Sequence, residues 1–593
     1  MSGFDFAPRA LPPSLGALRP FDRTLARWVL ANGGSNALAE IAALAAFAEA
    51  QGHACLVPGL PGVPAFDPSL LDAAAGDPML GDGGTPTPFV RDADDRIYLW
   101  RNFRHEQVAA AHLARRRAAA APPSPEALAP DLAVLFGGAA QQADPLQRAA
   151  VAAVAGRRFV LLTGGPGTGK TTTVLRMLLL LARRTPGVPP RIALAAPTGK
   201  AAQRLAESLR EGKARLAADL PADWQALLPG VNEGEATTVH RLLGWHPALD
   251  RWRHGPGDPL PHDVVVVDEA SMLDLAMLRA LLDALRPEAT VVLVGDAEQL
   301  GSVGAGSVLA DLVAALAHDD RGDLVRLSRV FRASAPLAGI SAAVGAGDTT
   351  ALRAALDAAG PAASIEAIGT AAAQRHALHG WADAIAAGWP RVGPDPRDPD
   401  APAQAAAALA ALRRMQLLCA LREGPFGADA ANALLVERLR DRFGVAGRGT
   451  SFGGRALLVT HNDHARRLYN GDVGLELEAP DGRVWAWFPA RAGDGGAGAR
   501  AIAPAALPPH AAAFALTVHK SQGSEYDAVA VLLPPDAAHP ILGRELLYTA
   551  VSRARERLCL WATPAALDAC LARAPRRGGG LRERLAQASA ALD

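Results

Sequence analysis

The middle of the chain alternates apolar runs with amphipathic segments, the pattern of strands and helices that follow one another in turn. We predict strands at 158–163, 192–196, 264–267 and 290–294. The segments between them predict helices at 171–184, 200–211 and 275–286. Residues 264–267 are four consecutive valines, as expected of a strand that is buried on both faces. The alternation therefore predicts a parallel sheet covered by helices on both sides.

A second unit with the same alternation follows. Its strands are predicted at 416–421, 456–460, 515–518 and 528–533. Two stretches interrupt the units: 245–261 is polar, turn-rich and aromatic and predicts a small hairpin, while 470–508 predicts a small β-barrel. The expected fold class is α/β, with two parallel-sheet domains in tandem.

The first part of the chain has a different pattern. Helical character at 25–50 and 106–117 and a short strand candidate at 96–101 predict a mostly helical domain over 1–117. The Pro- and Ala-rich stretch 118–130 predicts a linker. We expect the first parallel-sheet domain at 131–322 and the second at 323–593.

Bulk composition limits the possible environments of the protein. The 593 residues carry no formal net charge, so any nucleic-acid site must be a local arrangement. Cys55, Cys419, Cys559 and Cys570 lie far apart, as expected of reduced thiols in a cytoplasmic protein. The start of the chain lacks the basic and apolar regions of a signal peptide, and no apolar run is long enough to span a bilayer, so we expect no membrane association.

Lysine is rare enough in this chain for its positions to be informative. Lysine occurs at only four positions, Lys170, Lys200, Lys213 and Lys520, although Lys and Arg together number 60. Lys170 is the lysine of the sequence G-x-x-x-x-G-K-T at 164–171, the phosphate-binding loop of nucleoside triphosphatases. The loop predicts an ATP site formed by Gly164, Gly165, Pro166, Gly167, Thr168, Gly169, Lys170, Thr171 and Thr172.

Acidic and amide side chains follow two later strands of the same predicted sheet. Asp268 and Glu269 come directly after the four valines, and Gln299 follows the strand at 290–294. We expect the Thr171 hydroxyl and Asp268 to hold Mg²⁺, and Glu269 to orient or deprotonate the attacking water. Gln299 is expected to sense the γ-phosphate.

The order of these and further motifs resembles that of the superfamily 1 helicases. Residues 196–202 resemble motif Ia, 238–244 the next DNA-contact motif, 327–332 motif IV, 514–527 motif V and 548–555 motif VI. The resemblance implies that Gln147 reads adenine, and that Arg332 and Arg553 reach the γ-phosphate from the second domain. It also implies single-stranded DNA contacts by Pro197, Thr198, Gly199, Lys200, Thr238, His240, Thr517, His519 and Lys520.

Within that superfamily the chain is most similar to the RecD family, the α subunits of exodeoxyribonuclease V. Residues 416–427, 459–463 and 469–474 carry this likeness, and 99–106 resemble the family's first domain. The resemblance implies two RecA-like motor domains, an SH3-like insertion at 470–508 and a 5′→3′ helicase that uses ATP and Mg²⁺. It also implies a bacterial heterotrimer with RecB-like and RecC-like subunits that unwinds and degrades DNA at double-strand breaks for recombinational repair, with the N-terminal domain docked on a partner.

Three alternatives differ from this prediction. One is a stand-alone RecD-like or relaxase-type helicase, although residues 1–130 show no helix-hairpin-helix series. A second is a nuclease, for which only Glu211-Gly-Lys213 has a matching pattern, and it lacks a suitable upstream aspartate. A third is a scaffold without catalysis, which the intact Lys170, Asp268, Glu269 and Arg553 disfavour.

Overall fold

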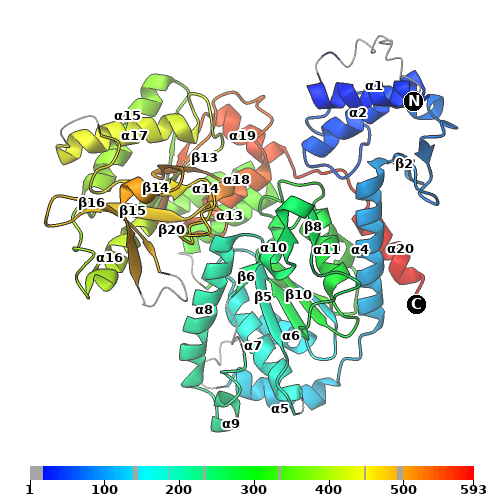
Figure 1. Ribbon diagram of the computed structural model, residues 1–593, viewed down its shortest axis with the longest axis horizontal. Coiled ribbons are helices and arrows are strands. Elements are labelled where there is room, and N and C mark those ends of the chain that lie inside the picture. The colour runs from blue at the N-terminus through cyan, green and yellow to red at the C-terminus, as the bar shows by residue number, and fades with distance from the viewer. Residues whose placement is uncertain are drawn as a thin grey trace.

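The computed structural model describes residues 16, 18–137, 144–185, 187–231, 236–331, 335–445, 449–490 and 498–592. Two parallel-sheet domains stand side by side, and an N-terminal domain lies above the first (Figure 1). We call them the first sheet domain, the second sheet domain and the N-terminal domain. The C-terminal segment leaves the second sheet domain and crosses to the far side of the first, where the chain ends beside α4 (Figure 1). Within the described ranges no helix is both long and apolar enough to cross a membrane.

The first sheet domain is built on six parallel strands in the order β11-β4-β10-β9-β5-β6. Their bounds are Phe159–Gly164 (β4), Ile192–Ala196 (β5), Thr237–Thr238 (β6), Val264–Val267 (β9), Thr290–Gly295 (β10) and Leu324–Leu327 (β11). Alternate residues of each strand face opposite sides, so Phe159 and Leu161 belong to one core and Val160 and Leu162 to another. Both faces are therefore covered, and the α/β prediction is confirmed for this half.

Helices from distant parts of the chain make up these two cores. One face packs against α5 (Pro125–Leu135), α6 (Pro145–Ala153), α7 (Lys170–Arg184) and α8 (Gly199–Ala217). The other packs against α4 (Trp100–Ala118), α11 (Leu275–Ala284), α12 (Val308–Leu316) and α20 (Leu581–Ala590). Helix α20 lies against α4 and α12, so both ends of the chain complete the first sheet domain.

Three of the expected boundaries are wrong. The linker predicted at 118–130 is helical from Pro125, because Ser124 caps α5 by accepting the N–H of Ala127 at 3.3 Å and proline is suited to the first helical position. The first sheet continues past residue 322, since β11 pairs with β4. The range 323–593 also contains α20, which packs on the first sheet domain rather than the second.

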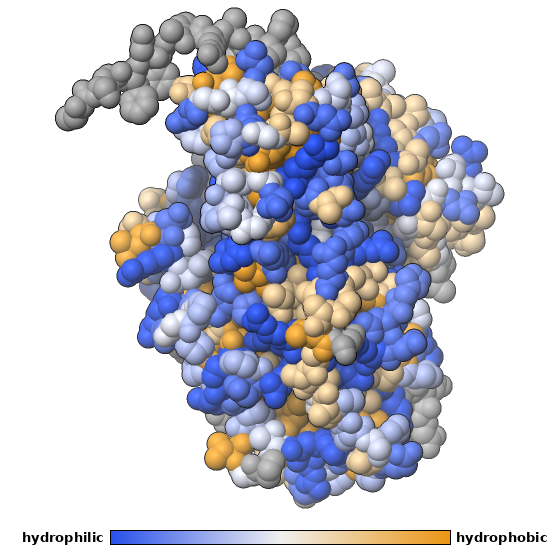
Figure 2. Space-filling view, turned by 90° about the vertical axis from the view of Figure 1, so that its right-hand side faces the viewer, coloured by the Kyte–Doolittle hydropathy of each residue, from blue (hydrophilic) through white to orange (hydrophobic). Residues whose placement is uncertain are grey.

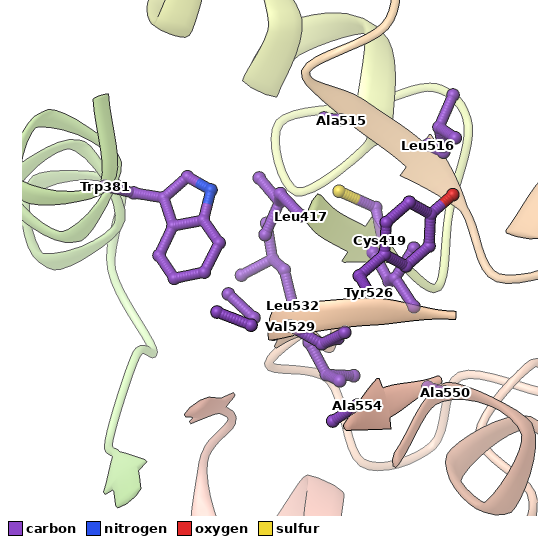
Figure 3. Close-up of a cluster of buried hydrophobic side chains, with 14 of the residues drawn as sticks. Trp381, Leu417, Cys419, Ala515, Leu516, Tyr526, Val529, Leu532, Ala550 and Ala554 are labelled. Carbon is purple, nitrogen blue, oxygen red and sulfur yellow. The ribbon is translucent and has the colours of Figure 1, made fainter. Parts of the chain in front are cut away.

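The second sheet domain has five parallel strands in the order β12-β21-β20-β13-β19. Their bounds are Ala363–Glu366 (β12), Met415–Cys419 (β13), Ala515–Thr517 (β19), Tyr526–Leu532 (β20) and Ala554–Trp561 (β21). Its helices are α13 (Ala335–Ala346), α14 (Thr349–Ala359), α15 (Ala371–Ala386), α16 (Ala401–Leu409), α17 (Ala428–Phe443), α18 (Arg544–Val551) and α19 (Pro564–Ala572). Trp381 of α15 points toward Leu417, Val529 and Leu532 of the sheet (Figure 3).

A separate antiparallel sheet interrupts this domain. Its order is β17-β16-β15-β14-β18, with bounds Ala456–Val459 (β14), Val473–Glu478 (β15), Val484–Pro489 (β16), Ala499–Ile502 (β17) and His510–Ala512 (β18). The prediction that 456–460 belongs to the parallel sheet is wrong. Although β14 is buried along its whole length, it pairs antiparallel with β15 and β18. The insertion therefore begins at β14, before residue 470.

The N-terminal domain contains two helices in the region whose sequence predicted helical character at 25–50. Helix α1 (Pro20–Ala31) ends before Gly33, whose φ of 88° is unfavourable for other residues. Ser35 then caps α2 (Asn36–Ala50) by accepting the N–H of Leu38 at 3.1 Å. The short helix α3 (Ser69–Ala73) and a three-stranded sheet of β1 (Leu80–Gly81), β2 (Phe89–Arg91) and β3 (Ile97–Leu99) complete the domain.

Candidate nucleotide and DNA sites

The glycine-rich loop joins the end of β4 to the start of α7. Gly167 and Gly169 have φ values of 73° and 83°, which favour glycine, and Gly169 precedes the first residue of α7. The Lys170 ammonium donates to the carbonyl oxygens of Gly164 and Gly165 at 2.6 and 3.0 Å. A free helix N-terminus, backbone N–H groups and one ammonium thus meet at a single point, which is the arrangement that favours a polyphosphate.

Gln147 contacts this loop from α6. Its buried amide nitrogen donates to the carbonyl oxygen of Thr168 at 3.1 Å. A Cβ added at Gly169 would lie 2.5 Å from the same nitrogen, so the loop can approach Gln147 this closely only with glycine at that position. The side chain therefore positions the loop; the adenine contact that the resemblance implied remains a prediction.

Asp268 and Glu269 follow β9 at the same edge of the sheet. The pKa of Asp268 is raised, chiefly by burial and next by the Glu269 carboxylate, while Lys170 opposes the shift. Glu269 has a φ of 52°, an uncommon value for a residue with a side chain. A Cβ at Gly523 of the second sheet domain would lie 3.8 Å from Glu269 Oε1, so this carboxylate faces the interface between the sheet domains.

These groups fit a divalent cation. A carboxylate whose pKa is raised by burial and by an adjacent negative charge is stabilised in its charged form when a cation binds. Thr171, the second expected ligand, lines the same cavity as Asp268. Oxygen donors of this type suit Mg²⁺, which is held by few protein ligands together with phosphate oxygens.

Gln299 follows β10 and is buried. Its amide nitrogen donates to Asp296 Oδ2 at 2.9 Å, whereas its Oε1 is enclosed without a hydrogen-bond partner among the described residues. Asp296 Oδ2 also accepts the hydroxyl of Tyr548 at 3.1 Å, and Tyr548 belongs to α18 of the second sheet domain. The carboxylate thus joins Gln299 to the opposite domain.

A cavity of about 220 Å³ opens between the two sheet domains at the loop. The first sheet domain contributes the loop, Asp268, Glu269 and Gln299, and the second contributes Gly523, Glu525 and Arg553. Buried Arg553 is oriented by the carbonyl oxygens of Thr549 at 3.1 Å and Ser524 at 3.2 Å. Arg332, the other arginine expected here, lies outside the described residues.

Further side chains that were not predicted from the sequence line this cavity, among them three charged ones. Arg204 of α8, Glu525 and Arg413 all face it. Glu525 lies within the segment that resembles motif V, so its place at the nucleotide cavity could have been predicted from the sequence. Arg413 gives no comparable signal, because it is one of many arginines and belongs to none of the helicase motifs.

The expected DNA contacts of the first sheet domain lie at one edge of the sheet. Strand β6 pairs with β5, which places Thr238 beside Ala196. The hydroxyls of Thr198 and Thr238 cap α8 and α10 (Val239–Leu242), accepting the N–H groups of Ala201 and Arg241 at 3.2 Å each. Pro197, Thr198 and Gly199 are half-buried.

Lys200 has a different environment from the other candidates. It lines a cavity of about 360 Å³ between α8 and the antiparallel sheet, together with Arg204, Asp472 and Arg500. Its pKa is lowered to about 8, first by burial and then by Arg204. The structure therefore directs Lys200 toward the interface between the sheet domains rather than toward open solvent.

His240 is exposed and joins an aromatic group at the predicted hairpin. Strands β7 (Trp245–His246) and β8 (Arg251–Trp252) form that hairpin. The ring centroid of His240 lies 6.4 Å from Trp245 and 5.4 Å from Trp252, and the two tryptophans are 4.5 Å apart. These rings pack on one another as a small core, and the exposed histidine edge remains accessible.

Three further candidates follow β19 in the second sheet domain. Thr517 ends the strand, and its hydroxyl accepts the N–H of exposed Lys520 at 3.4 Å. His519 is largely enclosed, and burial, with a smaller contribution from Arg577, lowers its pKa. A neutral histidine beside an exposed lysine leaves Lys520 as the charged group of this segment.

Backbone groups of Leu300, the residue after Gln299, hold the two sheet domains together. Its N–H donates to the Thr549 hydroxyl at 2.7 Å, and its carbonyl oxygen accepts the Gln522 amide at 2.9 Å. Phe331 N–H donates to the carbonyl oxygen of Gly167 at 2.8 Å. These bonds connect the second sheet domain to the residue beside Gln299, and Phe331, just after β11, to the glycine-rich loop.

Comparison with known proteins identifies the family. Residues 147–305 match the AAA domain, and 512–561 match the UvrD-like helicase C-terminal domain. The RecBCD enzyme subunit RecD of Mycolicibacterium smegmatis is 39% identical over 538 residues, which cover 89% of this chain and 88% of that protein. The chain belongs to the RecD family. The family predicted from motif order is confirmed, and with it the assignment as an ATP-dependent DNA helicase.

Other RecD-type proteins are similar over shorter stretches. The RecBCD enzyme subunit RecD of Haemophilus influenzae is 30% identical over 66% of this chain and 64% of its own length. The ATP-dependent RecD2 DNA helicase of Deinococcus radiodurans is 32% identical over 62% of this chain but only 42% of its own. Among solved structures, a Bacteroides Pif1 bound to single-stranded DNA covers 69% of this chain and 90% of its own at 17% identity, with a TM-score of 0.34.

Proposed function

We propose that this RecD-family helicase is a 5′→3′ DNA translocase that acts as one motor of a bacterial cytoplasmic heterotrimer with RecB-like and RecC-like subunits. The complex would unwind and degrade DNA at double-strand ends, with the nuclease centre on another subunit. The observation that carries the motor assignment is the cavity at the glycine-rich loop, which both sheet domains line. Its relatives named as RecBCD subunits support the complex.

In the proposed reaction ATP binds in this cavity with its phosphates on the loop. The N–H groups from Gly165 to Thr171 and the Lys170 ammonium would bind the β- and γ-phosphates. Thr171 and Asp268 would hold Mg²⁺, which supplies charge neutralisation at the phosphate oxygens. Glu269 would accept a proton from the attacking water, and Arg553 would neutralise charge that develops on the γ-phosphate.

Movement would follow from the contacts of Gln299 and Leu300. Gln299 lines the cavity, and the next residue is bonded to Thr549 and Gln522. Loss of the γ-phosphate would therefore shift the second sheet domain relative to the first. The expected contacts other than Lys200 are half-buried or exposed, and they would bind the phosphates of single-stranded DNA, largely without regard to base sequence: Pro197, Thr198, Gly199, Thr238, His240, Thr517, His519 and Lys520.

Translocation polarity is the decisive test of this proposal. We expect the purified chain to displace strands from a duplex with a 5′ single-stranded tail and not from one with a 3′ tail. ATP hydrolysis should rise when a poly-dT oligonucleotide is added. Unwinding only from 3′ tails would contradict the assigned polarity, whereas ATPase without any response to DNA would contradict the motor itself.

Assembly is tested separately. Tagged chain co-expressed with the RecB-like and RecC-like proteins of the same bacterium should purify as a 1:1:1 complex. A chain that purifies alone while showing DNA-stimulated ATPase would instead favour a stand-alone helicase.

A further inference from the structure

The C-terminal segment after α19 passes between all three domains. Gly578 N–H donates to His53 Nδ1 at 3.0 Å, and Gly578 oxygen accepts the N–H of Ala54 at 2.7 Å. Because His53 Nδ1 accepts a hydrogen bond, its Nε2 carries the proton and donates to the Pro61 oxygen at 3.2 Å. The segment is thus fixed to the N-terminal domain through a neutral histidine.

Three consecutive glycines allow the segment to pass. A Cβ at Gly578 would lie 2.6 Å from the Cys55 oxygen, and one at Gly580 would lie 2.3 Å from Arg96 Nη1 and 2.4 Å from the Tyr98 hydroxyl. Gly580 N–H donates to Glu106 Oε1 of α4 at 2.9 Å. The passage is therefore too narrow for a side chain, and α20 continues from it onto the first sheet domain.

Arg577 precedes these glycines and contacts the loop 301–306. One guanidinium nitrogen donates to the carbonyl oxygens of both Gly304 and Gly306 at 3.1 Å. Gly306 N–H in turn donates to the Gly52 oxygen at 3.0 Å, and a Cβ at Gly52 would lie 3.0 Å from the guanidinium carbon. Arg577 thus joins this loop to the N-terminal domain.

The second sheet domain meets the same guanidinium. Glu545 of α18 interacts electrostatically with Arg577: burial raises the pKa of the Glu545 carboxyl, and both this guanidinium and the backbone of Gly301 lower it. Asp311 of α12 also faces the guanidinium. Arg577 therefore lies where the N-terminal domain, the first sheet domain and the second sheet domain meet.

The loop held by Arg577 begins directly after Gln299 and Leu300. Gln299 lines the nucleotide cavity, and Leu300 carries the backbone bonds to the second sheet domain. We propose that Arg577 is a positioning residue for DNA-stimulated ATP hydrolysis: it anchors the loop 301–306 behind Gln299 and thereby couples closure of the two sheet domains to the N-terminal domain. This inference rests on the proposed motor function.

The test compares Arg577→Ala with Arg576→Ala in the full chain. Arg576 is the exposed neighbour of Arg577, so its variant removes the same charge without the loop contacts. We expect Arg577→Ala to lower the DNA-stimulated kcat about tenfold, the effect of losing charge-assisted hydrogen bonds. The KM for ATP and the ATPase without DNA should change less than about twofold, because the glycine-rich loop with Lys170 is untouched. Arg576→Ala should behave like the wild type.

A conservative variant separates positioning from folding. Arg577→Lys keeps the charge near Glu545 but replaces the planar donor with a single flexible ammonium, so it should retain an intermediate stimulation at an unchanged melting temperature. If Arg577→Ala does not fold, Arg577→Lys alone decides the question. DNA stimulation at the wild-type level in Arg577→Lys would overturn the proposal. Equal loss of basal and stimulated ATPase in Arg577→Ala, or stimulation equal to that of Arg576→Ala, would also overturn it. A wild-type chain without DNA stimulation would refute the motor function as well.

Discussion

The two interfaces of the first sheet domain are built in opposite ways. Toward the second sheet domain it presents cavities of about 220 and 450 Å³ beside the glycine-rich loop, bridged by single hydrogen bonds such as Tyr548 to Asp296. Toward the N-terminal domain and α20 it presents buried ion pairs, among them Arg117 with Asp323 at 2.8 Å. The first interface therefore contains cavities that a ligand can fill, whereas the second is packed around paired charges.

Charge is arranged differently at these two interfaces. At the α4–α20 interface Arg584 donates to Glu106 at 3.1 Å and to Asp92 at 3.0 Å, so opposite charges are paired. Figure 2 views the molecule from this side, where hydrophilic residues are interspersed with apolar ones. At the nucleotide cavity Asp268 and Glu269 adjoin each other, and Lys170 and Arg553 lie around them. Paired charges fix one arrangement, while adjacent charges of the same sign favour a ligand of opposite charge.

Lys170→Arg should produce the largest effect, and only at the first interface. The planar guanidinium does not fit where the compact ammonium contacts the loop carbonyls, so ATP turnover should fall at least about a hundredfold. Steady-state ATPase with poly-dT measures this, and the melting temperature should stay at the wild-type value. Turnover at the wild-type rate would show that the loop does not bind the phosphates.

Arg117→Ala tests the second interface. Arg117 is buried and pairs with Asp323 and Asp319, so its loss leaves buried Asp323 with only its longer ion pair to Arg157, at 3.6 Å. We expect a loss of stability at the lower end of the range for a broken buried pair, about 3 kcal/mol, measured by denaturant unfolding of the transition that includes α4. Exposed Arg115 on the same helix supplies the matched control, Arg115→Ala, which should change stability by less than about 0.5 kcal/mol. Similar values for both variants would show that the buried pair is not what holds this interface.

Tyr548→Phe weakens the bridge between the sheet domains without changing the cavity's charges. Asp296 keeps its bond from Gln299 and loses only the bond from the tyrosine hydroxyl. The activation free energy of DNA-stimulated hydrolysis should therefore rise by about 1.5 kcal/mol, the lower end for a hydrogen bond to a charged acceptor. We expect DNA-stimulated kcat to fall about tenfold with normal stability. A loss of stability without a change in stimulation would place this bond among the static contacts.

Local patterns were sufficient for much of the fold. The ranges predicted for β5 and β9 match the structure. Both strands lie inside the first sheet, and a strand that is covered on both faces has a continuous apolar sequence. Strand β21 was not predicted, since Arg555, Glu556 and Arg557 are exposed and interrupt its apolar pattern. Its place beside β20 is set by pairing with distant strands, which the local sequence does not encode.

In the candidate site, too, some residues could be predicted from local sequence and others depend on distant segments. The glycine-rich loop, Asp268 and Glu269 are encoded by short spacings and come together at one cavity. Arg413 and Arg577 could not be predicted, because their roles depend on segments that are far away in the sequence. The requirement for Gly580 likewise comes from Arg96 and Tyr98, which approach it only after the chain has folded.

Asp311→Asn probes the charge balance of the second interface, and its effect should depend on pH. Burial, and next the carboxylates of Glu106 and Glu583, raise the pKa of Asp311 to about 7 in the folded chain. Since the ordinary value is about 3.9, the folded state holds this proton more tightly than the unfolded state. Stability associated with Asp311 is therefore complete below about pH 4 and is lost as pH rises through 7.

Asparagine is always neutral, so the variant should match the wild type near pH 4 and melt a few degrees higher at pH 8. Exposed Asp320 provides the control Asp320→Asn, which should show no such divergence. A gain that is equal at both pH values would mean that Asp311 remains ionised within the interface, balanced by Arg577.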